Sequence, residues 1–155
     1  MPETVFYRDA LLKSATPAIE SRGIIITEVI NKKQLNEFIN FPYRLYKGNK
    51  YYVPQLKKDI EGTLSKNKNP AFEFCEAKYW LAYKENKVVG RIAAIINHRY
   101  IEKWKNSYIR FGWIDFEQEE EIAKKLLTQV EIWAKEKGMN AVHGPIGFTN
   151  FDYAG

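Results

Sequence analysis

The sequence contains a single cysteine, Cys75, and only two histidines, His98 and His143. One cysteine excludes an intramolecular disulfide and fits a reducing compartment such as the cytoplasm. These residues form no Cys-x-x-Cys or His-x-x-x-His spacing, so nothing indicates a bound metal. There is also no run of roughly 18 apolar residues that would cross a membrane, and no apolar stretch typical of a secretory signal. We therefore expect a cytoplasmic protein with no metal and no membrane partner.

The sequence has a mild excess of basic over acidic residues. The 155 residues carry 24 Lys and Arg against 19 Asp and Glu, a net charge of +5. The excess lies within residues 1–70, which hold 12 basic and 7 acidic side chains, whereas residues 71–155 hold 12 of each. This bias is well short of a nucleic-acid-binding tail.

The most informative segment runs from Ala77 to His98, with the sequence AKYWLAYKENKVVGRIAAIINH. Its first half alternates as a strand does, and the polar turn Lys84 to Lys87 follows. Its second half, Val88 to Ile96, is apolar at nearly every position. The pattern predicts a β-hairpin whose second strand is buried on both faces.

Other patterns outline the rest of one domain at residues 24–155, preceded by a weakly structured extension at residues 1–23. Asn31 with Gln34 three residues later forms a capping-box pattern that begins a helix, and Pro42 is expected to end or kink it. Further strands are predicted at 24–29, 108–116 and 139–142, and further helices at 56–64, 100–105 and 119–137.

The segments WLAYKENKVVGRIAAIINH and RFGWIDFEQEEEIAKKLLTQVEIWAKEKGMNAVHGPIGFTN resemble the central strands and the third helix of GNAT-type acyl-CoA N-acyltransferases. Together with FPYRLYKGNKYYVP, NPAFEF and GPIGF, they are similar to a group of bacterial GNAT-like proteins of uncertain function that are normally longer. The resemblance implies an α/β (α+β) fold with a mixed, mainly antiparallel sheet flanked by helices. It also implies that this sequence lacks the C-terminal elements of the full fold, which would belong to a missing part of a longer chain.

The resemblance implies transfer of an acyl group from acyl-CoA, as cosubstrate, to a small-molecule amine. The backbone of Ile114, Asp115 and Phe116 would then face the pantetheine arm. However, residues 115–121 hold five carboxylates and no glycine where such enzymes bind the CoA diphosphate, and carboxylates repel phosphate. The alternative is a non-catalytic GNAT-like module of a larger protein.

Asn97 and His98 follow the long apolar strand directly. In one interpretation they project into a cleft, where His98 acts as a general base near neutral pH. In the other, they cap the end of the strand and hydrogen-bond the next loop.

Basic and aromatic residues alternate between Phe41 and Pro54, including Arg44, Tyr46, Lys47 and Tyr51. These side chains are candidates for binding an anionic ligand, since an arginine fork suits phosphate or carboxylate. The same pattern is also typical of a surface loop whose tyrosines cover the core. Single-stranded nucleic acid is a third and weaker possibility, because no RNA-binding signature accompanies the tyrosines.

Overall fold

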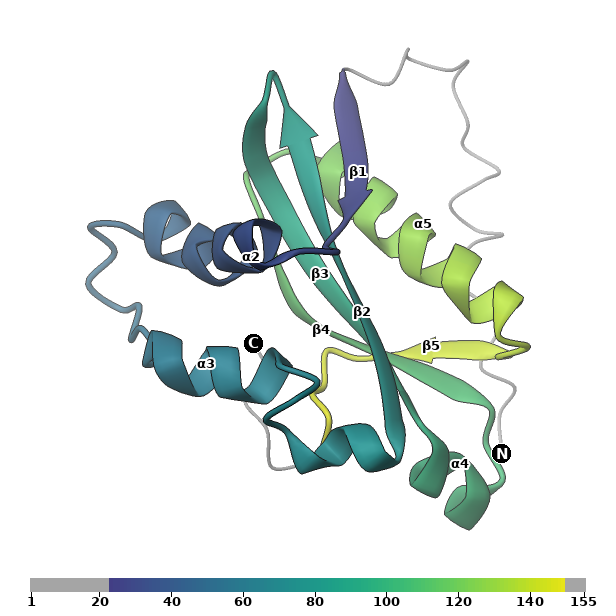
Figure 1. The fold of residues 1–155 in the computed structure, drawn as a ribbon. Coiled ribbons are helices and arrows are strands. Elements are labelled where there is room, and N and C mark those ends of the chain that lie inside the picture. The colour runs from purple at the N-terminus through teal and green to yellow at the C-terminus, as the bar shows by residue number, and fades with distance from the viewer. Residues whose placement is uncertain (1–22, 150–155) are drawn as a thin grey trace, which may run out of the picture.

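The structure, a computed structural model, describes residues 23–149 (Figure 1). Of the extension expected at residues 1–23, only residue 23 lies within them. The elements are, in chain order, β1 (Ile24–Glu28), α2 (Lys32–Leu45), α3 (Lys57–Leu64), the 3-10 helix η1 (Pro70–Glu73), β2 (Cys75–Lys84), β3 (Lys87–Asn97), α4 (His98–Trp104), β4 (Tyr108–Phe116), α5 (Glu120–Glu136) and β5 (Ala141–His143).

The five strands form one sheet in the order β1-β2-β3-β4-β5. Neighbours from β1 to β4 are antiparallel, and β5 alone runs parallel to its neighbour β4. Helices α2 and α3 lie on one face of the sheet and α5 lies on the other (Figure 1). The expected mixed, mainly antiparallel sheet flanked by helices is confirmed.

Strand β3 is buried on both faces, as its apolar run predicts. Ala93 and Ile95 belong to the core under α2 and α3, whereas Ile92 and Ile96 belong to the core under α5. Alternate side chains of a strand point to opposite faces, so one continuous apolar segment supplies both cores.

A two-residue turn joins β2 to β3. Glu85 and Asn86 have φ of 50° and 62°, and the flanking residues Lys84 and Lys87 are paired. Two successive residues with positive φ form the turn whose twist matches that of the two strands. The predicted hairpin is therefore confirmed.

The start of α2 is as predicted, and one of the two expectations for Pro42 is wrong. Asn31 Oδ1 accepts a hydrogen bond from the backbone N–H of Gln34 at 2.9 Å, and Gln34 Oε1 accepts one from Ile30 at 2.8 Å. The helix does not end at Pro42, because it continues to Leu45. Proline cannot donate to the carbonyl four residues earlier. That carbonyl, of Phe38, instead accepts a hydrogen bond from Arg91 Nη1 at 2.8 Å.

The remaining boundaries agree with the patterns within two residues. Helix α4 begins at His98, two residues before its predicted start, and β5 begins at Ala141, two residues after its predicted start. Helix α5 matches its pattern closely, with Ile122, Leu126 and Val130 buried.

Candidate functional site

A β-bulge interrupts β4 opposite Ile92. Arg91 pairs with Asp115 and Ala93 with Gly112, so β4 uses one more residue than β3 over the same stretch. Trp113 is one of the two β4 residues that lie opposite Ile92, and it has a φ of 45°, which is rare for a large side chain. A bulge bends its strand and redirects the residues that follow it. Here those residues are Ile114, Asp115 and Phe116.

Beyond the bulge, β4 separates from β5. Strand β5 pairs only with Tyr108–Arg110. The following loop then approaches β4, since Ile146 N donates to Phe111 O at 2.8 Å and a Cβ on Gly112 would lie 2.7 Å from Ile146 O. Within residues 23–149, no strand pairs with Ile114–Phe116 on the side away from β3. The three residues expected to face pantetheine therefore lie on an open strand edge.

The side chain of Asp115 is held inside the protein by two partners. Arg91 approaches Asp115 Oδ2 at 2.8 Å through both Nε and Nη2, and the Tyr46 hydroxyl donates to Oδ1 at 2.8 Å. The Arg91 side chain is only 7% exposed and that of Asp115 16%. This network joins β3, β4 and α2, so it fixes the bulged strand relative to the helix.

Burial determines the ionisation of this network. Desolvation lowers the pKa of Arg91, and the Asp115 carboxylate opposes that shift. Desolvation first, and then the hydrogen bond to Asp115, raises the pKa of Tyr46 to about 12. At neutral pH Tyr46 is therefore a neutral donor to the carboxylate, and the Asp115 side chain is committed to structural contacts.

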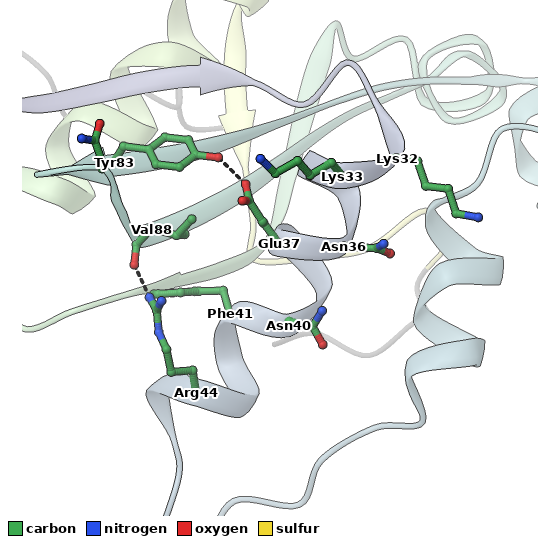
Figure 2. A pocket seen from close by; sticks show the side chains of 10 residues that line it. Lys32, Lys33, Asn36, Glu37, Asn40, Phe41, Arg44, Tyr83 and Val88 are labelled. Atoms are coloured by element: carbon green, nitrogen blue, oxygen red, sulfur yellow. Dashed lines mark hydrogen bonds between the residues drawn. The ribbon is translucent and has the colours of Figure 1, made fainter.

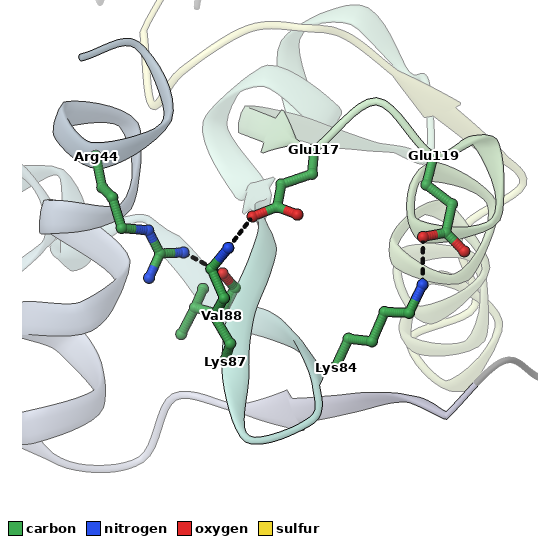
Figure 3. A network of polar contacts seen from close by, with 6 residues as sticks. All are labelled: Arg44, Lys84, Lys87, Val88, Glu117 and Glu119. Carbon is green, nitrogen blue, oxygen red and sulfur yellow. Dashed lines mark hydrogen bonds and ion pairs between the residues drawn. The ribbon is translucent and has the colours of Figure 1, made fainter.

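The junction between β4 and α5 is closed by ion pairs. Lys87 lies 3.0 Å from Glu117 and Lys84 lies 2.7 Å from Glu119 (Figure 3). Both lysines come from the ends of the hairpin strands. Glu119 is also the N-cap residue of α5, and Glu120 and Glu121 follow in its first turn. Carboxylates thus occupy the positive end of the helix.

A CoA diphosphate does not fit this junction as it stands. Anion sites at helix starts need free N–H groups and no competing negative charge. Here four glutamates stand within the three-residue connection and the first helical turn. Glu119 Oε1 is itself buried and has no hydrogen-bond partner among the described residues. The carboxylates that the sequence shows in place of a diphosphate site are therefore also gathered at this junction in the folded chain.

The basic and aromatic candidates on α2 and its following loop do not converge on one point. Arg44 donates to the carbonyl of Val88, and Tyr46 points inward to Asp115. Lys47 and Tyr51 are exposed on the loop, and Tyr51 is 81% exposed. Their role in ligand binding stays a prediction, with Arg44 and Tyr46 already making contacts within the protein.

A cavity of about 700 Å³ lies between α2 and the hairpin turn (Figure 2). Its lining combines apolar surface, from side chains such as Phe41 and Val88, with the charged side chains of Lys32, Lys33, Arg44 and Glu37. The Tyr83 hydroxyl donates to Glu37, and burial followed by this contact raises the pKa of Tyr83 to about 12. Sequence reasoning missed the cavity, because polar residues at helical spacing are also typical of a solvated helix face.

Asn97 and His98 occupy different environments at the end of β3. Asn97 is buried, caps α4 by accepting from Tyr100 N at 2.9 Å, and donates to Phe148 O at 3.2 Å. His98 is exposed and lies 3.0 Å from Glu76. His98 follows Ala93 by five residues, which in a strand is about 16 Å from the bulge. The structure thus does not bring His98 to the open edge of β4, and its role as a base stays a prediction.

Residues 23–149 contain neither a metal-binding cluster nor a membrane-spanning helix. No cluster of three or more His, Cys, Asp or Glu side chains is placed to hold a metal ion. No helix in this part of the chain has the length and apolar character to span a bilayer.

The element order and the mixed, mainly antiparallel sheet agree with the fold that the sequence resemblance implied. The chain matches the acetyltransferase (GNAT) family over residues 41–145 and belongs to that family. In structure it is similar to a tandem GNAT protein from the clavulanic acid biosynthesis pathway. The TM-score is 0.57 at 12% identity, over 75% of this chain and 34% of that one.

Two bacterial relatives are similar in sequence. Protein YghO of Escherichia coli (strain K12) is 32% identical over 130 residues, which are 84% of this chain and 33% of YghO. The bacterial ceramide synthase of Caulobacter vibrioides (strain NA1000 / CB15N) is 26% identical over 117 residues, 75% of this chain and 30% of that protein. The chain therefore spans about a third of the length of these relatives.

Proposed function

We propose that this chain is part of a longer bacterial N-acyltransferase, which moves an acyl group from a CoA thioester to an amine. The observation that carries the proposal is the open edge of β4 at Ile114–Phe116, directly after the bulge at Trp113. Backbone N–H groups on an unpaired strand edge are free to donate to a carbonyl oxygen. They stabilise such an oxygen most when it becomes negatively charged during acyl transfer.

The chemistry of such a transfer is balanced without a further reactant. The amine nitrogen attacks the thioester carbonyl carbon, a C–N bond forms and the C–S bond breaks. The thiolate leaves and takes up a proton, while the amine gives one to a base. His98 lies too far along β3 to serve at this edge, so the proposal assigns the base and the diphosphate site to the remainder of the longer protein.

The acceptor that we propose is the amine of a long-chain amino alcohol. Its support is the similarity to the ceramide synthase, since a ceramide is the amide of such an amine with a fatty acid. The test is to incubate a longer natural version of this protein with long-chain acyl-CoA and a sphingoid amine. We expect release of free thiol and formation of the amide, detected by mass spectrometry. Absence of amide with this acceptor and with short amines would overturn the proposal.

A second candidate is a non-catalytic GNAT module that serves as a scaffold within the larger protein. The specific observation in its favour is the junction of β4 and α5, where Lys84–Glu119 and Lys87–Glu117 fill the place of a diphosphate (Figure 3). Titration with acetyl-CoA, followed by heat and by thermal shift, separates the two candidates. Micromolar binding by the 155-residue chain would overturn the scaffold function, and no binding by the longer protein would overturn the acyltransferase function.

A further inference from the structure

The connection between α2 and α3 exposes apolar side chains among lysines. We call residues 47–58 the basic loop. Tyr51, Val53 and Leu56 are 81%, 75% and 71% exposed. The exposed lysines of the loop are Lys47, Lys50, Lys57 and Lys58. No acidic residue occurs between Glu37 and Asp59, so the loop carries positive charge with none of the opposite sign.

The basic loop is held in shape from beneath by tyrosines. The Tyr52 ring packs against Tyr46 at 4.7 Å and against Tyr43 at 6.5 Å between centroids. The Tyr43 hydroxyl donates to Gln55 O, and Tyr52 N donates to Asn49 O at 3.2 Å. The inner tyrosines therefore fix the backbone, and this arrangement directs the neighbouring side chains of Tyr51 and Val53 to the outside.

We propose that the basic loop docks on an anionic lipid bilayer, with Tyr51, Val53 and Leu56 entering the interface and the lysines contacting lipid phosphates. Single exposed apolar residues need no explanation, but three within six residues indicate an interaction surface. Apolar side chains among basic ones are the chemistry of interfacial membrane binding. Lysines flanking the apolar side chains complement the negative surface of such a bilayer.

The loop suits a bilayer better than a nucleic acid. Binding to a single strand relies on aromatic side chains on which bases stack. Of the four tyrosines in this region, Tyr43, Tyr46 and Tyr52 pack on one another, and only Tyr51 is open. The other exposed apolar side chains of the loop, Val53 and Leu56, are aliphatic. They insert into acyl chains but cannot stack on bases.

The loop also suits a bilayer better than a protein surface. The buried centre of a protein interface is depleted of lysine. Here Lys50 directly precedes Tyr51, with its Nζ 4.9 Å from the ring centroid, and Lys57 directly follows Leu56. A bilayer takes up both kinds of side chain, because the lysine stems extend to the headgroups. This proposal revises our expectation of no membrane partner, which considered only a spanning helix. It does not depend on acyl transfer.

The test is sedimentation of the 155-residue chain with vesicles of phosphatidylcholine, with and without phosphatidylglycerol. We expect binding only to the anionic vesicles, and weaker binding at high salt. A variant with Lys47→Gln, Lys50→Gln and Lys58→Gln is expected to lose about fivefold in affinity for each lysine. A variant with Tyr51→Ser, Val53→Ser and Leu56→Ser is expected to lose binding even to anionic vesicles.

Matched variants control for net charge and for exposed apolar surface in general. Lys32→Gln, Lys33→Gln and Lys135→Gln remove the same charge elsewhere, and Ile25→Ser, Ile30→Ser and Ile132→Ser remove exposed apolar side chains elsewhere. Both control variants are expected to bind as the parent does. Equal losses in the controls, or binding to an oligonucleotide without binding to anionic vesicles, would overturn the proposal.

A fluorescent label reports on the loop directly. Cys75 is buried and is the only cysteine in the sequence, so a dye on Val53→Cys marks position 53 selectively. We expect an environment-sensitive dye to shift to the blue on anionic vesicles, in this chain and in a longer natural version whose other cysteines are replaced by serine. If position 53 resists labelling in the longer protein, another part of that protein covers the loop, and the proposal is overturned.

Discussion

Arg91 occupies the place that a helix hydrogen bond leaves open at Phe38. Its Nη1 donates to the Phe38 carbonyl at 2.8 Å, and its guanidinium also lies over the Phe38 ring, 5.0 Å from the centroid. The carbonyl lacks its usual donor because position 42 is a proline. The same guanidinium pairs with Asp115 next to the bulge in β4. The Arg91 side chain therefore connects the missing helix hydrogen bond in α2 to the β-bulge in β4.

Arg91→Met is expected to destabilise the protein by about 3–5 kcal/mol, because it leaves the largely buried Asp115 carboxylate without its cationic partner and the buried Phe38 carbonyl without its donor. Asp115→Leu added to Arg91→Met is expected to recover part of that loss, since no unpaired charge then remains. Lys124→Met is the control, because Lys124 forms only an exposed ion pair with Glu120, and such pairs contribute little to stability. Urea unfolding measures all three. A loss for Arg91→Met as small as that for Lys124→Met would contradict the assignment.

Gly112→Ala is expected to displace the loop that follows β5. A Cβ at this position would lie 2.7 Å from the backbone oxygen of Ile146, which cannot rotate away as a side chain does. We expect a loss of about 1–3 kcal/mol and faster hydrogen exchange at the Ile146 amide. Gly62→Ala is the matched control, since open space surrounds Gly62 in α3 and alanine favours a helix by about 1 kcal/mol. Equal stability for Gly112→Ala and the parent would show that the loop does not pack as described.

Glu119→Gln is expected to strengthen acetyl-CoA binding at the start of α5, in any version of the protein that binds it there. The change removes a carboxylate from the positive end of the helix and frees Lys84 from its ion pair. Removing one charge a few ångströms from a phosphate corresponds to about fivefold in affinity. Glu136→Gln, at the other end of α5, is expected to leave the affinity unchanged. Isothermal titration with both variants is the measurement, and an unchanged affinity for Glu119→Gln would mean that the diphosphate lies elsewhere.

Local patterns predicted the hairpin, the capped start of α2 and helix α5, because each depends on neighbours within four residues or on simple alternation. The bulge in β4 could not be predicted. The sequence has a tryptophan at the position with positive φ, where glycine would be the usual signal. Pairing with β3 and packing against distant segments impose that conformation. Pro42 also misled, because Arg91, 49 positions later, supplies the donor that proline lacks.

The candidate site was predicted only in part, again because contacts between distant segments determine its geometry. Ile114–Phe116 followed from the resemblance, and their place on an open edge became visible only with the register of β4. Nothing in the spacing of Arg91, Asp115 and Tyr46 indicates that they meet, since they come from three separate elements. The outward direction of Tyr51 and the inward direction of Tyr52 likewise depend on tertiary packing, because the two are adjacent and identical in type.

Stability is expected to fall at alkaline pH in a way that depends on Tyr46. Its pKa in the folded protein is about 12, against an ordinary value of 10.0, because of burial and the hydrogen bond to Asp115. The folded state therefore holds the phenol proton more tightly than the unfolded state does. The resulting stabilisation is complete below pH 10 and is lost as the pH rises from 10 towards 12.

Tyr46→Phe cannot titrate at position 46, so its free energy of unfolding should decline less steeply over this range. Tyr83→Phe should behave likewise, since the pKa of Tyr83 is also raised to about 12. Urea unfolding at several pH values tests both variants, and a slope for Tyr46→Phe equal to that of the parent would contradict the hydrogen bond between Tyr46 and Asp115.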